Sequence, residues 1–158
     1  MKQKIIATTA ALFGLLASMS CPAQSVYTYS ADASGTASAL VTDSKTGLTW
    51  QRCSAGQSFA AGTCSGTVNL YTHEEALAYA KAQTGWRLPS VKEFSSLVDS
   101  SVIGPAINSA AFPATPSNYA WASSPYASDS SSAWAVYFGD GAVSASSRSN
   151  SYHVRLVR

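Results

Sequence analysis

The feature that most constrains the fold is an alternating stretch in the last third of the chain. From Trp134 to Phe138, large apolar residues occupy every second position, which is typical of a β-strand with one buried face. A turn at 139–141, rich in glycine, leads into a return through Val143 and Ala145. A strand, a short turn and a second strand predict an antiparallel hairpin. We expect the Trp134 face to point into the core and Tyr137 to lie on the opposite face.

Further strands are predicted at both ends of the chain. Residues 39–42 and 48–51 flank a turn at 43–47, which predicts a second hairpin with Trp50 directed inward. Alternation from Tyr152 to Val157 predicts a final strand. The Ser-, Ala- and Thr-rich lead-in over 24–39 predicts either one short strand or a poorly ordered segment.

Two helices are predicted between these hairpins, each by a capping box. Thr72 is followed three residues later by Glu75, and the helix is expected to run to about Gln83, with an apolar stripe of Ala76, Leu77 and Ala80. Ser90 and Glu93 repeat the pattern before Phe94, Leu97 and Val98, which are spaced as one helix face. First-turn carboxylates favour the positive end of a helix, so we interpret these glutamates as structural rather than catalytic.

Loops occupy much of the rest of the chain. Residues 99–117 contain three prolines and many small residues, which predicts a long irregular connection anchored by Ile107 and Phe112. The serine-rich stretch at 128–132 is interpreted as the tip of a hairpin.

Length and charge exclude several classes of protein. A chain of 158 residues is the size of one domain. Ten Lys and Arg residues face eight Asp and Glu residues, and removal of Lys2 and Lys4 with a leader would leave eight against eight. The remaining cations form no basic run, so we expect no binding of nucleic acid.

The N-terminus is typical of a Sec-type signal peptide over residues 1–23. Two lysines precede an apolar run from Ile5 to Ala17, and small residues follow it. Cleavage after Ala23 is favoured over lipidation at Cys21, because Ser18 stands where a lipoprotein signal carries a Leu-like residue. No stretch is long enough to predict a transmembrane helix. We therefore expect export to the periplasm, the cell surface or the medium.

Two cysteines remain after the leader, Cys53 and Cys64. In an exported protein they are expected to form a disulfide that closes a loop with few core-forming residues. The alternative is a catalytic cysteine acting with His73 or His153, which we consider much weaker.

Five motifs follow one another along the chain: Asp43–Trp50, Trp86–Phe94, Tyr119–Ser124, Trp134–Gly141 and Val154–Arg158. Their order resembles a known family over residues 40–158. It is similar to the Lcl C-terminal domain family, named after the C-terminal domain of the Legionella collagen-like adhesin. The resemblance implies an α+β, C-type-lectin-like fold, in which two helices pack on a twisted antiparallel sheet with long loops and one disulfide. It also implies a secreted or surface protein, since some members are adhesins for glycans.

A second resemblance concerns the start of the second helix. Arg87 to Ser90, followed by an acidic helix, looks like the corresponding start in formylglycine-generating sulfatase-modifying enzymes, which share the wider lectin-like architecture. Those enzymes need catalytic cysteines, and pairing of Cys53 with Cys64 leaves none. The same activity is therefore not expected.

Candidate ligand-binding residues are three tyrosines and three arginines. The tyrosines flank loops or fall opposite the Trp134 stripe, whereas the tryptophans Trp86, Trp121 and Trp134 are expected in the core. The arginines are close to the C-terminus and would form a cationic edge for sulfated or acidic glycans, although they would equally well solvate a terminal strand. The candidates are Tyr119, Tyr126, Tyr137, Arg148, Arg155 and Arg158.

No metal, cofactor or catalytic constellation is predicted. The oxygen-bearing residues of the distal half, Asn118, Asp129, Asp140 and Asn150, form no calcium-lectin signature, and Asp140 between two glycines suits a turn. The two histidines are eighty residues apart and suggest no zinc site. The best remaining polar set for an enzyme would combine His153 with Asp140 and Arg155.

The sequence therefore favours an exported, non-enzymatic binding module of adhesin type for surface or matrix glycans. The alternative is a structural or assembly protein of the cell envelope or a pilus that binds another protein. The chain lacks the collagen-like repeats of the family's namesake, and its oligomeric state is not predicted.

Overall fold

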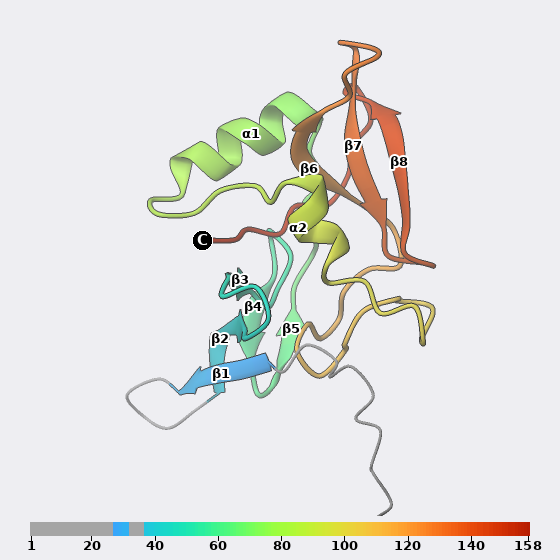
Figure 1. Cartoon of the computed structure of the whole chain (residues 1–158). Coiled ribbons are helices and arrows are strands. Elements are labelled where there is room, and N and C mark those ends of the chain that lie inside the picture. The colour runs from blue at the N-terminus through green and yellow to red at the C-terminus, as the bar shows by residue number, and fades with distance from the viewer. Residues whose placement is uncertain (1–26, 32–36) are drawn as a thin grey trace, which may run out of the picture.

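The computed structural model describes residues 27–31 and 37–158, and the expected signal peptide and its Cys21 lie outside them. The fold is α+β, with two helices and three small antiparallel sheets rather than one continuous sheet (Figure 1). The sheets have the orders β1-β2-β3, β4-β5 and β6-β7-β8. The elements are β1 (Tyr27–Ala31), β2 (Ala37–Asp43), β3 (Thr49–Gln51), β4 (Ser58–Ala60), β5 (Thr63–Ser65), α1 (His73–Ala82), α2 (Val91–Ser95), β6 (Tyr119–Pro125), β7 (Ser132–Tyr137) and β8 (Ala142–Ser147).

The first sheet contains the predicted hairpin of β2 and β3. Val41 pairs with Trp50, whose side chain is fully buried as expected. The turn is closed by Asp43, whose carboxylate accepts hydrogen bonds from the Lys45 amide at 2.9 Å and the Thr46 hydroxyl at 2.8 Å. The lead-in contributes β1, so the alternative of a short strand is correct for residues 27–31.

The second sheet is a small hairpin that the sequence did not predict. A disulfide joins Cys53 to Cys64, as expected, and β4 and β5 pair inside the loop that it closes. Phe59 on β4 lies 4.2 Å from the guanidinium of Arg52. The disulfide and this contact tie the hairpin to the end of β3.

Both helices begin at the predicted capping boxes. The Thr72 and Ser90 hydroxyls accept from the amides of Glu75 and Glu93, and both glutamate side chains accept in return from the cap amides. The capping role expected of these two glutamates is confirmed. Leu77 was wrongly assigned to the core: it is 39% exposed, because the buried stripe of α1 is Ala76, Ala80 and the first residue, His73.

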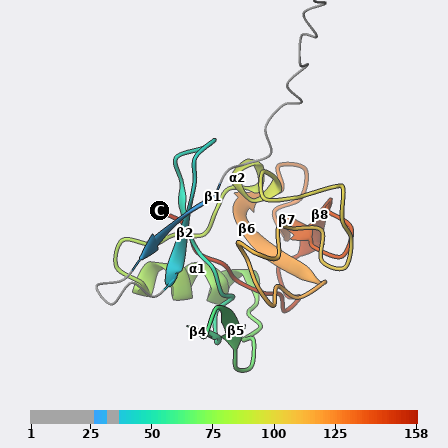
Figure 2. The same ribbon diagram turned by 90° about the horizontal axis from the view of Figure 1, so that it is seen from below.

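The third sheet is covered on both faces, which the alternating pattern did not predict. On one face, Val136 and Phe138 pack with Phe94 and Leu97 of the α2 region. On the other, Ala133 and Ala135 pack with α1 and Trp121. Figures 1 and 2 show α1 and α2 on either side of β6. Both faces of β7 are therefore core, although its sequence suggested one.

The C-terminal segment is extended but does not form the predicted strand. Residues 153–157 are buried at odd and even positions alike. The segment makes isolated bridges to several elements instead of one ladder, because each neighbour accompanies it for only a residue or two. It therefore joins the first sheet to the third. Its backbone partners are Thr49, Gln51, Ala55, Tyr71, Arg87, Tyr119 and Trp121.

The irregular connection 99–117 is fastened by its predicted anchors and by two buried arginines. Ile107 and Phe112 are buried. Arg52 donates to the carbonyls of Ala111 at 2.9 Å and Ala110 at 2.8 Å. The Arg155 guanidinium lies over the Phe112 ring, 4.9 Å from its centroid. The long loop is thus held by charged groups inside the protein.

Candidate functional site

The most distinctive surface feature is a stack of aromatic rings on the third sheet, which we call the tyrosine ladder: Tyr137, Tyr119, Tyr152 and Trp121. Successive ring centroids are 4.8, 4.9 and 4.6 Å apart. The three tyrosines are partly exposed, whereas Trp121 is fully buried. The ladder therefore runs from the surface into the core. Beyond Trp121, the buried ring of His73 meets it edge-on at 5.1 Å.

Sheet register and one glycine place the ladder. Tyr119 on β6 pairs directly with Tyr137 on β7, so the two side chains share a face. A β-carbon built on Gly139 would lie 2.4 Å from the Tyr137 ring, so only glycine lets this ring lie across the turn. At the inner end, the Trp121 indole N–H donates to the Tyr71 carbonyl at 2.8 Å. These contacts fix the rings before any ligand arrives.

Polar groups border the ladder. The Asn150 amide donates to the Tyr152 hydroxyl at 3.0 Å, and this hydroxyl lies 3.4 Å from the hydroxyl of Ser146 on β8. Ser144 projects from β8 on the same face, because it pairs with Ala135. The face thus combines stacked rings with hydroxyl and amide groups, which suits a ligand with both apolar and polar surfaces.

Arg148 lies at the end of this face, just after β8. Its Nε donates to the Ser132 carbonyl at 3.2 Å. It lines a hollow of about 380 Å³ with Thr72, Glu74, Leu77 and Ser149. The single salt bridge of the described residues joins Arg87 to Glu93, so no carboxylate there forms an ion pair with Arg148. Its guanidinium therefore forms no ion pair within the described residues and shares the hollow with the Glu74 carboxylate.

The structure brings together only part of the predicted binding set. Tyr119, Tyr137 and Arg148 share one face of the third sheet. Tyr126 packs edge-on against Trp134 at 5.2 Å, on the opposite face. Arg158 lies over the Trp86 ring at 4.7 Å, at the C-terminus, on the other side of the molecule from β8 (Figure 1).

The predicted cationic edge of three arginines does not form, because Arg155 is buried and only 2% exposed. It donates to the carbonyls of Gln51 and Arg52 and, at 2.8 Å, to the Thr115 hydroxyl. Burial lowers the pKa of its guanidinium. Arg155 therefore holds the fold and cannot contact a surface ligand.

Two of the tryptophans are less buried than expected. Trp121 is in the core as predicted, but Trp134 and Trp86 are partly exposed. On the face of β7 that packs on α2, Val136 belongs to the core cluster and Trp134 does not. The Trp134 ring packs instead against Tyr126 near the hairpin tip. Arg158 lies over Trp86, so its ring is not an open platform.

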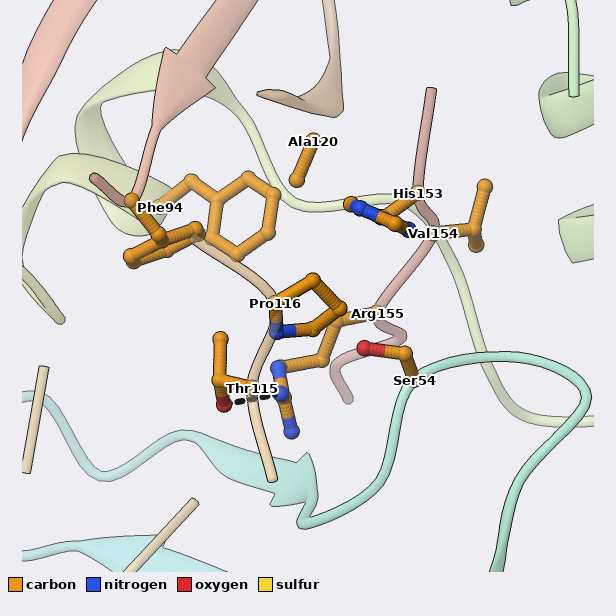
Figure 3. A pocket seen from close by; sticks show the side chains of 9 residues that line it. Ser54, Phe94, Thr115, Pro116, Ala120, His153, Val154 and Arg155 are labelled. Carbon is orange, nitrogen blue, oxygen red and sulfur yellow. Dashed lines mark hydrogen bonds between the residues drawn. The ribbon is translucent and has the colours of Figure 1, made fainter. Parts of the chain in front are cut away.

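The small cavity beside Arg155 is not a ligand site (Figure 3). It measures about 10 Å³, which is room for about one water molecule. Its wall includes Ser54, Pro116 and His153, and the Arg155 guanidinium is bonded to Thr115 at one side. Neither ring nitrogen of His153 has a protein partner. Burial, assisted by the charge of Arg155, lowers the His153 pKa, so its imidazole is neutral near pH 7.

The carboxylates of the distal half serve loops. Asp129 accepts from the hydroxyls of Ser131 and Ser132, and Asp140 accepts from the Ala142 amide at 2.9 Å. Asp140 therefore has the predicted turn role and makes no contact with His153. Among residues 27–31 and 37–158, no three His, Cys, Asp or Glu side chains group as metal ligands.

Family membership follows from the match of one family model. The model of the Lcl C-terminal domain matches residues 39–158, which is most of the chain. The chain belongs to the Lcl C-terminal domain family. Neither curated proteins nor solved structures gave a match. Membership of the Lcl C-terminal domain family indicates an adhesin-related module, and the described residues contain no helix long and apolar enough to cross a membrane.

Sequence reasoning missed Tyr152, which connects the ladder to the core of this Lcl C-terminal domain. Its alternation with His153 suggested a strand residue of no special role. No local pattern in the sequence marks it, because its position depends on a distant contact: Tyr152 bridges by backbone to Tyr71, whose own ring stacks on Tyr79 at 5.0 Å.

Proposed function

We propose that this domain is an exported, non-enzymatic binding module of adhesin type that recognises surface or matrix glycans on the tyrosine ladder. The observation that carries the proposal is the ladder itself, in which three partly exposed tyrosines lie in a row anchored on buried Trp121. Tyr119 and Tyr152 are stacked, and the Tyr137 ring is tilted by 40° to that of Tyr119. Aromatic rings held in this way provide contact area at low entropic cost.

The chemistry of the face matches a saccharide. A sugar ring has an apolar C–H face, which packs on an aromatic ring, and a rim of hydroxyl groups that need hydrogen-bonding partners. The hydroxyl of Tyr152, the amide of Asn150 and the hydroxyl of Ser144 offer donors and acceptors at the edge of the ladder. Arg148 adds a guanidinium for a sulfate or carboxylate group at one end.

The absence of enzymatic activity is part of the proposal. The Nε2 of His73 lies 3.0 Å from the Ala122 carbonyl, and His153 faces the core cavity. Cys53 and Cys64 are bonded to each other, so neither offers a free thiol. Within the described residues, therefore, neither histidine meets a nucleophile and a carboxylate in the arrangement that hydrolysis requires.

The finer architecture is proposed on the same basis. Two helices, antiparallel sheets, long loops and one disulfide are the parts of a C-type-lectin-like domain, and the C-terminal segment lies at the centre with β3 and β6. The disulfide also supports export, since such bonds persist in oxidising compartments.

A glycan array tests the proposal. The purified protein is applied to neutral and sulfated glycans, with calcium and with chelator, and binding to at least one class is expected in both conditions. Tyr119→Leu removes the central ring but keeps an apolar side chain, and we expect about tenfold weaker binding. Tyr126→Leu is the matched control on the opposite face and leaves binding unchanged. An array without signal for the wild-type protein would reject the glycan proposal.

The alternative function, an envelope or pilus component that binds a protein, is favoured by one observation: no other strand of residues 27–31 and 37–158 pairs with the outer side of β8. A pull-down from an envelope extract would then recover one dominant polypeptide, and Tyr119→Leu would not affect its capture.

A further inference from the structure

The tyrosine ladder passes from one part of the chain to another between Tyr119 and Tyr152. Tyr137 and Tyr119 lie on β7 and β6, whereas Tyr152 lies on the C-terminal segment. Within residues 37–158, the backbone hydrogen bonds between β6 and this segment are both made by His153. Its amide donates to the Tyr119 carbonyl at 3.1 Å, and its carbonyl accepts from the Trp121 amide at 3.0 Å. The position of His153 therefore decides whether Tyr152 stays in line with Tyr119.

Tyr152 has separate backbone bonds on its other side. Its amide and carbonyl both pair with Tyr71, which immediately precedes the cap of α1, at 2.9 Å. Tyr152 therefore belongs to the α1 side of the fold, and Tyr119 belongs to the third sheet. The Trp121 indole also reaches Tyr71, at the buried end of the ladder. At the exposed end, the contact between Tyr119 and Tyr152 depends on His153.

The imidazole of His153 faces the small cavity described above (Figure 3). The residue is 8% exposed, and both ring nitrogens are buried without a protein partner. The cavity measures about 10 Å³, which is room for about one water molecule. One water can serve one nitrogen of a neutral imidazole, but a protonated imidazole has two N–H groups and needs two acceptors. The cavity therefore suits only the neutral form.

The cavity wall offers no negative charge to balance a proton on His153. Among the residues that line the cavity with it, only Arg155 is ionisable, and its charge is positive. The other buried histidine, His73, packs on Trp121 instead and is influenced by Arg148. A protonated His153 would be a buried cation beside a second cation, in agreement with its lowered pKa. The uncharged wall residues come from α2, β6, the end of β7 and two loops: Phe94, Ala120, Phe138, Ser54, Thr115 and Pro116.

We infer that His153 makes the tyrosine ladder sensitive to acid: the rings stay aligned while its imidazole is neutral, and Tyr152 separates from Tyr119 when the imidazole takes up a proton. The protonated ring needs water, so it leaves the cavity and the backbone of residue 153 moves with it. Its hydrogen bonds to Tyr119 and Trp121 are then broken. Provided that the ladder binds glycans as proposed above, the domain holds its ligand at neutral pH and releases it in acid, and the ligand in turn opposes protonation of His153.

Ring contacts measured by nuclear Overhauser effects test the inference without any ligand. In the wild-type protein, we expect the contact between the Tyr119 and Tyr152 rings to be present at pH 7 and lost at pH 5. His153→Leu, which cannot take up a proton, should keep this contact at pH 5. Two contacts that do not cross the His153 junction should persist at both pH values: Tyr119–Tyr137 and Tyr71–Tyr79.

His73→Gln is the matched control, because it removes the other buried imidazole and keeps an amide for the Ala122 carbonyl. It should lose the Tyr119–Tyr152 contact in acid as the wild-type protein does. A wild-type protein that keeps this contact at pH 5, or a loss that His153→Leu shares, would overturn the inference. Loss of all three contacts together would also overturn it, because that result indicates unfolding. Since no glycan is present, a negative result leaves the proposed glycan site untouched, and a blank glycan array leaves this result untouched.

Discussion

Two regions of this domain use polar side chains in opposite ways. Around the 99–117 connection, Arg52 and Arg155 are only 4% and 2% exposed and donate to carbonyls of distant segments. On the third sheet, the tyrosine ladder and Arg148 keep part of their surface open. The sequence suggested that Arg148 and Arg155 belong to one cationic group. In the structure Arg155 holds the fold, whereas Arg148 faces solvent.

The difference shows that a buried arginine can replace secondary structure. The 99–117 segment contains no named helix or strand. It accepts three hydrogen bonds from the Arg52 and Arg155 guanidinium groups, at the carbonyls of Ala110 and Ala111 and at the Thr115 hydroxyl. Buried carbonyls that lose a donor cost free energy. Substitutions around the 99–117 segment are therefore expected to lower the free energy of unfolding strongly, and substitutions on the ladder face to change it little.

The largest expected effect is that of Arg155→Met, which keeps the length of the side chain and removes its donors. The carbonyls of Gln51 and Arg52 and the Thr115 hydroxyl would lose their partner. We expect the free energy of unfolding to fall by about 3 to 5 kcal/mol, measured by urea denaturation. Arg148→Gln is the control from the other region, with a change within about 0.5 kcal/mol. A similar loss of unfolding free energy in both variants would contradict the conclusion that Arg155 holds the fold and Arg148 does not.

The next effect is that of the disulfide. Replacing both Cys53 and Cys64 by Ala frees the β4–β5 hairpin, and we expect a loss of about 2 to 4 kcal/mol. Reduction of the wild-type protein should lower its melting temperature in the same way and leave the double variant unaffected. A wild-type melting temperature that does not respond to reductant would refute this role.

A smaller effect concerns pH and His153. Burial lowers its pKa in the folded state, so the unfolded chain binds the proton more readily. The stabilising contribution is present above the unfolded pKa of about 6.5 and decreases as pH falls through the lower folded value. In His153→Leu, the loss of stability between pH 7 and pH 5 should be shallower by up to about 1.4 kcal/mol per pH unit. Buried His73, whose pKa is also lowered, keeps part of the slope. An unchanged slope would show that His153 is not the group that titrates.

The smallest effect is expected for Glu93→Gln. Hydrogen bonds from Arg87 lower the Glu93 pKa to about 2, and the carboxylate also accepts from the Ser90 amide. Its contribution is present above the unfolded pKa of about 4.3 and decreases as pH falls toward the folded value. We expect a loss of about 0.5 to 1 kcal/mol at pH 7, because the ion pair is partly exposed. Denaturation curves should converge in strong acid. A constant difference from pH 7 to pH 2 would contradict the assignment.

Local signals predicted the local structure well. The capping boxes at Thr72 and Ser90 and the β7–β8 turn depend on neighbouring residues, and all three are where the sequence indicates. The pairing of Cys53 with Cys64 follows from counting cysteines in a chain that is expected to be exported. These features need no knowledge of distant contacts.

Features set by distant contacts were missed. The period of β7 indicates one buried face, but α1 and α2 cover both faces, and no local pattern encodes that. Arg155 alternates with Val154 and Leu156 as a surface residue would, yet it lies between Phe112 and Thr115, which are some forty residues away. The ladder likewise depends on Tyr152 meeting Tyr119 across the fold.

The most direct test of the central claim, that the ladder binds while the buried arginines hold the fold, is thermal denaturation of the protein across a panel of sulfated and neutral glycans, with calcium or chelator. A ligand that binds the folded state raises the melting temperature. We expect at least one glycan to raise it for the wild-type protein and for Tyr126→Leu, with and without calcium, and to lose this effect in Tyr119→Leu. A panel that shifts nothing, or a shift that Tyr119→Leu retains, would contradict the account.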